Sequence, residues 1–317
     1  MNSVRIEFRD FYRGFDPSDN FIVSALSELC SIEVGPGADI CFFSCFGTSH
    51  RTFVGCKVQV IGENVRPAFR EADFAIGFDR TTDDRFLRYP QWAWQKDTSA
   101  LMRPFGEDGR DEPPEFCAFV VSNPGSPFRN ALFEQLSRHR FVHAGGALFN
   151  NAPGPSPGGT GNWRQSKIEY LSRFRFTIAA ESSAYPGYTT EKLVDAFLAG
   201  SIPIYWGDPL VDCDFDPRAF INFNDFGTVT GTIEAVLEAD RDDATLRRIR
   251  STPPMSEATW NRTGSPHVLT AFLERVLAST GKAHARREWR RRAAAGRAKE
   301  LARKAGIRRI REFVRTT

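Results

Sequence analysis

Three residues whose side chains could hold a diphosphate and a sugar lie close together in the sequence: Tyr188, Glu191 and Lys192, within YTTEK. Lys192 supplies a positive charge, and a helix that begins here would add its dipole and its free backbone N–H groups. Glu191 would repel phosphate, so we expect it to face sugar hydroxyls. An isolated YTTEK also suits an ordinary exposed helix start, so the surrounding elements have to decide between the two interpretations.

The residues from Phe174 to Pro209 predict a strand, a polar loop, a helix and a second strand. Apolar and polar residues alternate at first and two alanines follow, so the first strand becomes buried before it stops at Glu181. Thr189 or Thr190 is expected to cap the helix. The predicted limits are a strand over 174–180, a helix over 191–198 ended by Gly200, and a strand over 202–206. Such a βαβ unit places its first loop at the carboxyl edge of a parallel sheet, where α/β proteins bind ligands.

This span resembles the signature region of the α-1,3/1,4-fucosyltransferases, glycosyltransferase family 10, and in particular its bacterial members. The motifs that carry the resemblance are Tyr-x-Thr-Glu-Lys, a helix with Asp-Ala-Phe, and Ile-Pro-Ile-Tyr-Trp-Gly, in this order. The resemblance implies GDP-fucose as the donor. Its implied donor-binding residues in this span are Thr177, Ser182, Tyr188, Glu191 and Lys192. The family usually has asparagine where this chain has Ser182, so a shorter or water-bridged donor contact is expected there.

Length and composition predict two domains with buried cores, because the chain has 317 residues, 41% of them hydrophobic. The first residues alternate like a strand and lack the features of a secretory signal. No apolar run reaches the length of a membrane span, so a cytoplasmic protein is expected. The six cysteines have no metal-binding spacing, which predicts reduced, mostly buried thiols rather than disulfides or a zinc site.

The first hundred residues show an alternating α/β pattern. An aromatic turn over 11–21 precedes a predicted helix over 22–29, and short apolar strands are predicted over 39–44 and 56–61. Bacterial family members begin with a similar FDP-x-x-N-x-F stretch, which belongs to the acceptor-side domain.

Glu63 follows the second of these strands within Gly62-Glu63-Asn64, so its carboxylate could project into a cleft. From the residues alone it is an ordinary solvated glutamate. The resemblance implies instead that Glu63 is the general base. Competing acids are Asp79, Asp83 and Asp84, but the nearby Arg80, Arg85 and Arg88 favour a solvated or ion-paired turn.

A charged segment rich in proline and glycine, residues 103–115, is the predicted linker between domains. A buried strand is predicted over 116–121 and a helix over 129–136. Arg129 at the helix start is unfavourable for the helix dipole unless an anion is nearby, so it is a candidate phosphate ligand; a solvated arginine is the alternative. The family's phosphate-binding arginine lies in a matching context, which adds Ser122 and Asn123 to the implied donor site.

Two patterns suggest a metal and are interpreted otherwise. Asp212-Cys213-Asp214 has the D-x-D form of another glycosyltransferase fold, but only Asp214 fits the family pattern at this place. His139 and His143 are four residues apart without a third ligand. No metal is therefore expected. The segment 152–161, APGPSPGGTG, is predicted to be a mobile loop.

The charge is unevenly distributed along the chain. Residues 282–317 hold fourteen Lys and Arg against three Glu, a net +11, whereas the preceding residues carry a net −8. We interpret this basic tail as a membrane-surface helix attracted to anionic lipid, with a solvated or partly disordered tail as the alternative. Nucleic acid is the least favoured partner, since no DNA-binding motif accompanies the charge.

The resemblance implies an α/β fold of the GT-B type, two Rossmann-like domains with a cleft between them; the residue patterns alone predict only α/β. The predicted limits are 1–110 for an acceptor-side domain, 115–280 for a GDP-fucose-binding domain and 281–317 for the basic tail. The implied reaction moves fucose with inversion to a hydroxyl, O3 in our reading, of an N-acetylglucosamine- or glucose-containing glycan, either N-acetyllactosamine-like or lipid-linked. The alternatives are a transferase for another nucleotide sugar and a non-catalytic nucleotide-sugar-binding protein of membrane glycolipid synthesis.

Overall fold

A computed structural model of the chain describes residues 3–105, 115–155 and 163–280. The chain forms two compact units. The first comprises Met1–Val60, Ala68–Ala75 and the described residues after Leu269, and the second comprises Ile61–Pro67 and Ile76–Leu269. The linker predicted over 103–115 falls mostly outside the described residues, so the domain limits 1–110, 115–280 and 281–317 stay a prediction.

The first unit contains four parallel strands in the order β2-β1-β3-β4. Strands β1, β3 and β4 lie where the sequence predicts strands, and Asn20 caps the helix by accepting hydrogen bonds from the backbone N–H groups of Ile22 and Val23. The helix ends at Ser27, two residues before its predicted end. The elements are β1 (Ser3–Arg9), α1 (Phe21–Ser27), β2 (Ser31–Val34), β3 (Ile40–Phe43) and β4 (Cys56–Val60).

A buried carboxylate joins the loops that follow β1 and β3 in this unit. Asp10 has a left-handed backbone, with φ at 59°, and accepts hydrogen bonds from the backbone N–H groups of Ser49 and His50, both at 2.9 Å. Nδ1 of His50 lies 2.6 Å from Asp10 Oδ2, and its Nε2 lies 2.9 Å from Glu71 Oε2. Burial opposes the charge of Asp10, but these hydrogen bonds outweigh it and lower its pKa to about 2.

The second unit is built on a five-stranded sheet with the order β11-β10-β9-β7-β8, in which every neighbouring pair is parallel. Its central strand β9 pairs with β10 in a register that aligns Phe176 with Ile202 and Ala180 with Trp206. The five strands are β7 (Glu115–Phe119), β8 (Val142–Ala144), β9 (Phe174–Ala180), β10 (Ile202–Trp206) and β11 (Ile221–Asn222). The strands predicted over 174–180 and 202–206 are therefore confirmed residue for residue.

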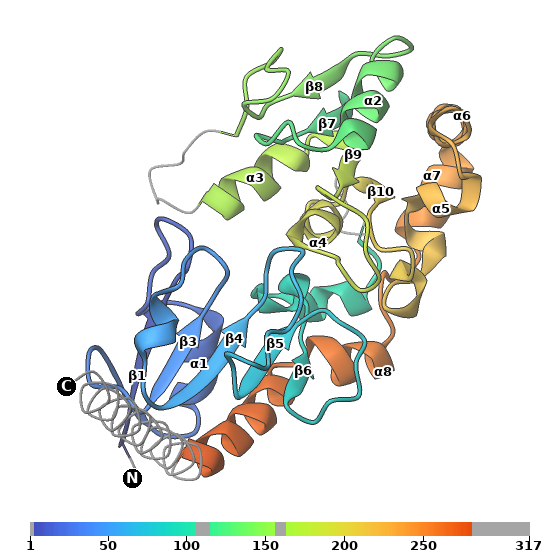
Figure 1. The fold of residues 1–317 in the computed structure, drawn as a ribbon. Coiled ribbons are helices and arrows are strands. Elements are labelled where there is room, and N and C mark those ends of the chain that lie inside the picture. The colour runs from blue at the N-terminus through green and yellow to red at the C-terminus, as the bar shows by residue number, and fades with distance from the viewer. Residues whose placement is uncertain (1–2, 106–114, 156–162, 281–317) are drawn as a thin grey trace, which may run out of the picture. The chain divides into compact units, whose positions relative to one another are not determined.

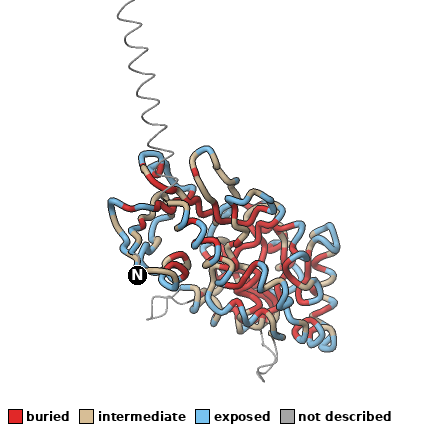
Figure 2. Tube along the Cα trace, turned by 90° about the horizontal axis from the view of Figure 1, so that it is seen from below, coloured by how far each residue is buried: buried red, intermediate tan, exposed pale blue. Residues whose placement is uncertain are grey.

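Helices cover both faces of this sheet (Figure 1). Helices α2, α6 and α7 contribute to one hydrophobic core with alternate strand residues such as Phe119, Phe176 and Ile204, whereas α3 packs on the other side against Ala118 and Phe174. Buried runs (red) alternate with exposed loops in Figure 2. The helices are α2 (Pro127–Leu136), α3 (Trp163–Leu171), α4 (Glu191–Leu198), α5 (Phe223–Phe226), α6 (Val229–Arg241), α7 (Asp243–Arg250) and α8 (Glu257–Thr259). This is the layered architecture of a doubly wound α/β domain.

The remaining elements are short strands and one longer helix. Strands β5 (Phe74–Gly77) and β6 (Phe86–Arg88) follow β4 along the chain, and residues 266–280 are helical. The helix predicted over 191–198 is present as α4.

All six cysteines are free, and Cys41, Cys56 and Cys117 are buried as expected. Cys30 is half-buried, whereas Cys45 and Cys213 are exposed because they lie in a bend after β3 and in a 3-10 turn.

Candidate active site

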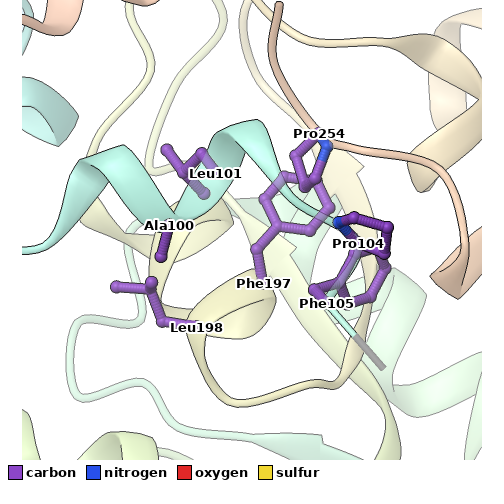
Figure 3. A pocket seen from close by; sticks show the side chains of 7 residues that line it. All are labelled: Ala100, Leu101, Pro104, Phe105, Phe197, Leu198 and Pro254. Atoms are coloured by element: carbon purple, nitrogen blue, oxygen red, sulfur yellow. The ribbon is translucent and has the colours of Figure 1, made fainter. Parts of the chain in front are cut away.

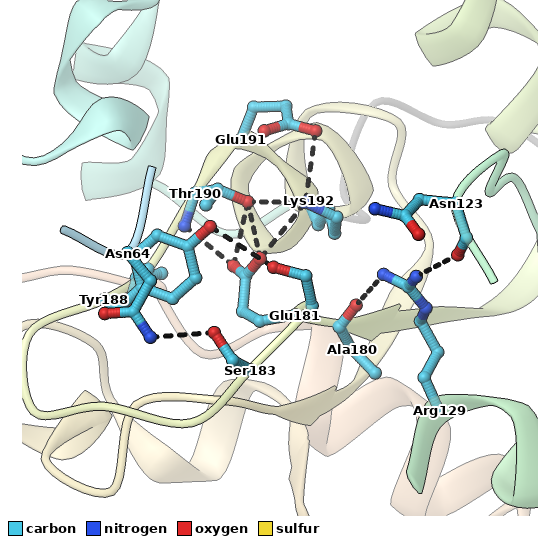
Figure 4. A network of polar contacts seen from close by, with 12 residues as sticks. Asn64, Asn123, Arg129, Ala180, Glu181, Ser183, Tyr188, Thr190, Glu191 and Lys192 are labelled. Carbon is cyan, nitrogen blue, oxygen red and sulfur yellow. Dashed lines mark hydrogen bonds and ion pairs between the residues drawn. The ribbon is translucent and has the colours of Figure 1, made fainter. Parts of the chain in front are cut away.

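Polar side chains gather where β7, β9 and β10 end at the carboxyl edge of the second unit's sheet (Figure 4). Glu181 follows β9 directly and is completely buried. Its carboxylate accepts hydrogen bonds from the backbone N–H and the hydroxyl of Thr190, each at 2.7 Å, and from Lys192 Nζ at 3.1 Å. Burial raises the pKa of Glu181, and the neighbouring Lys192 only partly opposes this shift.

Lys192 lies between two carboxylates. Its Nζ is 3.1 Å from Glu181 Oε2, 3.5 Å from Glu191 Oε1 and 2.8 Å from the hydroxyl oxygen of Thr190. Burial disfavours its charge, but the two carboxylates outweigh burial and raise the pKa of Lys192. Burial likewise opposes the charge of Glu191, yet Lys192 and Lys167 lower the pKa of Glu191 to about 2. Lys192 and Glu191 therefore both carry charge at neutral pH.

The expected threonine cap of α4 is absent. Thr190 occupies the N-cap position, but its side chain accepts no hydrogen bond from a backbone N–H group of the helix, because its hydroxyl donates to Glu181 and accepts from Lys192 Nζ instead. The hydroxyl of Thr189 lies 3.1 Å from that of Tyr205. The predicted capping role is therefore wrong for both threonines. A helix start without a side-chain cap keeps backbone N–H groups for another acceptor, such as an anion.

Two further ion pairs anchor α4 against α3. Asp195, completely buried on α4, accepts hydrogen bonds from Arg164 Nε at 2.8 Å and Lys167 Nζ at 2.9 Å. Lys167 also lies 3.7 Å from Glu191. This pairing fixes the start of α4, and with it the direction in which Glu191 points.

Arg129 lies inside the protein and not on its surface. Helix α2 begins at Pro127, two residues before the prediction, and Arg129 in its first turn is only 2% exposed. It donates hydrogen bonds to the backbone carbonyls of Asn123 at 2.6 Å and Ala180 at 3.4 Å, while its Nε has no hydrogen-bond partner. Burial lowers the pKa of Arg129. Within the described ranges no carboxylate forms an ion pair with it, so its charge is compensated by the two backbone carbonyls and by the more distant charge of Glu181.

Tyr188 closes the loop between β9 and α4. It is 3% exposed, its ring meets that of Phe78 edge to face at 5.0 Å between centroids, and its hydroxyl lies 3.4 Å from Ser182 Oγ. Burial raises the pKa of Tyr188 to about 12, and the charges of Glu181 and Glu63 add to this shift. The phenol is therefore neutral at physiological pH and able to donate a hydrogen bond.

Sequence reasoning missed Asp208 and the close approach of Gly207. Asp208 is completely buried and accepts hydrogen bonds from the backbone N–H groups of Gly187 at 2.8 Å and Leu210 at 2.7 Å. Burial raises the pKa of Asp208. A Cβ on Gly207 would lie 2.4 Å from Cγ of Glu181. Both residues belong to Trp-Gly-Asp-Pro, a sequence that predicts a turn. It does not reveal that Asp208 in this turn binds the backbone of the loop between β9 and α4.

The turn that carries Glu63 lies directly after β4, and Glu63 itself is exposed. Asn64 donates a hydrogen bond from Nδ2 to Ser183 Oγ at 2.7 Å. The charge of Glu63 also contributes to the pKa shift of Tyr188. The structure therefore brings Glu63 near the loop that holds Ser182 and Tyr188, within the second unit.

Three residues of the predicted donor site, Thr177, Ser122 and Asn123, lie outside the loop and helix start that hold Ser182, Tyr188, Glu191 and Lys192. Thr177 is buried within β9, with its hydroxyl 2.8 Å from that of Ser201. Ser122 and Asn123 are exposed in the loop after β7. The side-chain oxygen of Asn123 accepts a hydrogen bond from the backbone N–H of Gly125 at 2.8 Å. Arg129 is contacted by the backbone carbonyl of Asn123 and not by its side chain.

The competing acids are ion-paired in part as predicted. Asp83 pairs with Arg85 at 2.6 Å. Arg80 and Arg88, however, both form ion pairs with Asp214, which lies outside the turn over 79–84. Asp214, the second aspartate of the D-x-D pattern, is therefore engaged in ion pairs. His143 contacts Glu115 at 3.1 Å. Across residues 3–105, 115–155 and 163–280 no three His, Cys, Asp or Glu side chains form a possible metal site.

A cavity of about 140 Å³ lies elsewhere in the second unit (Figure 3). The side chains that line it are apolar and include Leu101, Phe105, Phe197 and Pro254. It offers no cation for a phosphate, so it is not a candidate for the nucleotide.

The predicted basic tail, residues 282–317, lies outside the described residues, as does most of the predicted mobile loop 152–161. Of the helices that the structure describes, none is long and apolar enough to cross a bilayer.

Two protein-family models match the chain: the α-(1,3)-fucosyltransferase FucT N-terminal domain over residues 6–95, and the C-terminal model of glycosyltransferase family 10 (fucosyltransferase) over residues 112–250. An α-(1,3)-fucosyltransferase FucT of Helicobacter pylori is 33% identical over 215 residues, which are 57% of this chain and 43% of that protein. The α-(1,3)-fucosyltransferase 4 of Mus musculus is 32% identical over 170 residues, 52% of this chain and 35% of that protein. The chain thus spans less than half the length of these curated relatives.

The fold is similar to that of solved fucosyltransferases. The crystal structure of an α1,3-fucosyltransferase with GDP-fucose superposes with a TM-score of 0.70 at 26% identity, covering 87% of this chain and 90% of that one. A structure of an α1,3-fucosyltransferase with GDP gives a TM-score of 0.72 at 24% identity. The predicted α/β fold of the GT-B type is confirmed. Since the two family models together account for residues 6–95 and 112–250, the chain belongs to glycosyltransferase family 10, the fucosyltransferases.

Proposed function

We propose that the protein transfers L-fucose from GDP-fucose to a hydroxyl of a glycan acceptor. The relatives named above are fucosyltransferases, and one of the similar structures contains GDP-fucose. The polar site at the carboxyl edge of the second unit's sheet has the groups that such a donor needs: two cations, a neutral phenol and a charged carboxylate.

The observation that carries this proposal is the buried charge of Arg129. A guanidinium that is 2% exposed and lacks an ion pair among the described residues is costly unless an anion joins it. A diphosphate would accept hydrogen bonds from the unpartnered Nε and the remaining N–H groups of Arg129. Lys192, whose Nζ donates a hydrogen bond to Glu181 (Figure 4), would supply the second cation.

The remaining residues divide into donor orientation and proton transfer. Glu191 and Tyr188 would hydrogen-bond the ribose or the fucose, and Ser182 and Asn123 would contribute further polar contacts. Glu63 would accept the proton of the attacking hydroxyl as the general base. Arg129 and Lys192 would stabilise the charge that develops on departing GDP, so this scheme requires no metal.

Attack of the acceptor hydroxyl on the face opposite GDP would invert the configuration at the anomeric carbon. We propose O3 of N-acetylglucosamine or glucose as the attacking oxygen, in an N-acetyllactosamine-like or lipid-linked oligosaccharide. Product NMR with defined acceptors would identify both the linkage and the anomeric configuration. A product that retains the donor's configuration would contradict the single-displacement scheme.

Calorimetric titration with GDP-fucose, GDP-mannose and UDP-sugars tests the donor assignment. We expect GDP-fucose to bind most tightly, with transfer to an acceptor glycan detected in parallel. Preference for another nucleotide sugar would assign the chain a different transferase activity, and tight binding without transfer would indicate a non-catalytic protein.

Glu63→Gln tests the general base. The variant should keep the parent's affinity for GDP-fucose and lose at least about 100-fold in turnover, the usual contribution of general-base catalysis. Unchanged turnover would remove Glu63 from the mechanism.

We propose finally that residues 282–317 bind anionic membrane surfaces at the periphery of the inner membrane. The support is their net charge of +11, attached to residues with a net charge of −8. Each Lys or Arg near such a surface contributes about 1 kcal/mol, screened by salt. A chain that ends at Gly281 should stop sedimenting with phosphatidylserine vesicles while its turnover of a soluble acceptor changes less than about tenfold. Vesicle binding that survives truncation would overturn this proposal.

A further inference from the structure

Arg66 contacts both the turn of Glu63 and the aromatic residues beside the donor loop, although no motif marks it. Its Nη1 donates a hydrogen bond to Asp79 Oδ1 at 2.7 Å, and its Nη2 donates to Asn64 Oδ1. The guanidinium lies over the ring of Tyr185, with Cζ 3.4 Å from the ring centroid, and 4.8 Å from the centroid of Phe78. All of these residues belong to the second unit.

These contacts use the planar shape of the side chain as well as its charge. Stacking on an aromatic ring and donating to two separate acceptors from one plane are properties of arginine that lysine lacks. Pro67 restricts Arg66 further, since the residue before a proline is biased towards extended backbone. Although the Arg66 side chain is 38% exposed, its contacts give it constraints that an ordinary exposed arginine lacks.

Asn64 connects Arg66 to both parts of the proposed site. It follows Glu63 directly, and its Nδ2 donates to Ser183 in the loop between β9 and α4. The turn is closed by a hydrogen bond from the backbone N–H of Val65 to the carbonyl of Glu63, at 2.7 Å. Because Arg66 holds the amide oxygen of Asn64, it also fixes which way the amide nitrogen points.

We propose that Arg66 is a positioning residue for Glu63: through Asn64 and Asp79 it holds the turn of the general base against the loop that binds the donor. The inference rests on the proposed function, since it assigns Glu63 the acceptance of the acceptor proton. It predicts that Arg66 matters for the chemical step and not for the binding of the nucleotide.

The first test is Arg66→Met, measured for GDP binding and for turnover. Misplacing a catalytic group by about 1 Å can cost on the order of 100-fold, so we expect kcat to fall at least about tenfold. The dissociation constant for GDP should stay within about threefold of the parent's, well below the tenfold change that 1.4 kcal/mol represents. The kcat of Arg66→Lys should lie between that of the parent and that of Arg66→Met. The matched control is Arg85→Met, which removes an arginine paired with Asp83 at 2.6 Å, and it should leave kcat unchanged.

The decisive measurement combines Arg66→Met with Glu63→Gln. If Arg66 acts through Glu63, adding Arg66→Met to the Glu63→Gln variant should lower kcat by no more than about twofold, because the effects of interacting sites are not additive. Losses that multiply would overturn this inference alone. Full turnover in Glu63→Gln would overturn both the base assignment and this inference. If Arg66→Met fails to fold, Asn64→Ala replaces it in the test. Asn64→Ala removes the hydrogen bond between Arg66 and Asn64 but leaves the ion pair of Arg66 with Asp79. Its loss of kcat must likewise disappear in the Glu63→Gln background, or the inference fails.

Discussion

Replacing Arg129 by methionine should separate nucleotide binding from stability, because the structure gives this residue a buried charge without a carboxylate partner. The variant keeps most of the side-chain volume and removes the charge. In the unliganded protein it loses hydrogen bonds from the charged guanidinium to the carbonyls of Asn123 and Ala180, each worth up to about 1.5 to 3 kcal/mol. It also removes a buried charge whose desolvation costs several kcal/mol. We therefore expect the free energy of unfolding to stay within about 1 kcal/mol of the parent's, or to rise.

GDP binding should respond in the opposite way. A charge-assisted hydrogen bond to phosphate contributes about 1.5 to 3 kcal/mol, so the dissociation constant should rise about 10- to 150-fold. At a GDP concentration of about 100 times the parent's dissociation constant, bound nucleotide stabilises the parent by about 2.7 kcal/mol. At the same concentration the stabilisation of the variant should fall to between about 0.3 and 1.4 kcal/mol.

Urea unfolding with and without GDP measures both quantities, and Arg88→Met is the matched control. Arg88 is also largely buried, at 17% side-chain exposure, but it is paired with Asp214. Its loss should lower the free energy of unfolding by on the order of 1 to 3 kcal/mol and leave the effect of GDP intact. The reasoning is refuted if Arg129→Met unfolds much more easily than the parent while GDP still stabilises it fully, since Arg129 would then be a structural residue.

Three further predictions concern Lys192, Gly187 and Asp10. Lys192→Ala should weaken GDP binding about 10- to 150-fold, measured by calorimetry, and unchanged affinity would show that α4 does not bind the diphosphate. Gly187→Ala should destabilise the fold by about 1 to 3 kcal/mol in urea, because φ is +88° and a Cβ would lie 2.3 Å from the carbonyl oxygen of Phe78; Gly14→Ala, with φ at +93° and open space around it, controls for the backbone alone. Asp10→Asn should lower the free energy of unfolding by about 2 kcal/mol at pH 6 and by about half of that at pH 3. The reason is that the pKa of Asp10 is lowered from 3.8 to about 2, so the stabilisation by its charge is present above pH 4 and lost as the pH falls towards 2. A difference in unfolding free energy that stays constant between pH 6 and pH 3 would contradict this assignment.

The sequence predicted the central βαβ unit closely because each element there follows one dominant pattern. Strand β9 alternates and then becomes apolar, α4 has a clear periodicity, and β10 is a short apolar run between glycines. These local signals do not depend on tertiary contacts. The limits of α1 and α2 were less accurate, since their ends are decided by caps and by proline at the first helical position.

The sequence singled out several of the polar residues that gather at the carboxyl edge of the second unit's sheet, but not the contacts that they make, and their assignment to the donor site stays a prediction. Hydrogen bonds between residues far apart in the sequence, such as that from Gly187 to Asp208, have no local signature. The two threonines before α4 have the composition of a cap, but a buried carboxylate from the preceding strand competes for Thr190. Whether an arginine such as Arg129 is buried or solvated is likewise decided by the elements packed around it.

Glu181 gives the site a response to protons that Arg129, Lys192 and Glu191 lack. Arg129 and Lys192 carry two positive charges, Glu191 is fully ionised at neutral pH, and the pKa of the completely buried Glu181 is already raised. A donor diphosphate placed beside it would raise this pKa further, and by linkage a proton taken up at Glu181 would tighten donor binding. Both phosphates of GDP-fucose are esterified, so neither competes for a proton near neutrality. Donor binding should therefore be accompanied by proton uptake from the buffer, and the affinity should increase as the pH falls towards the pKa of Glu181.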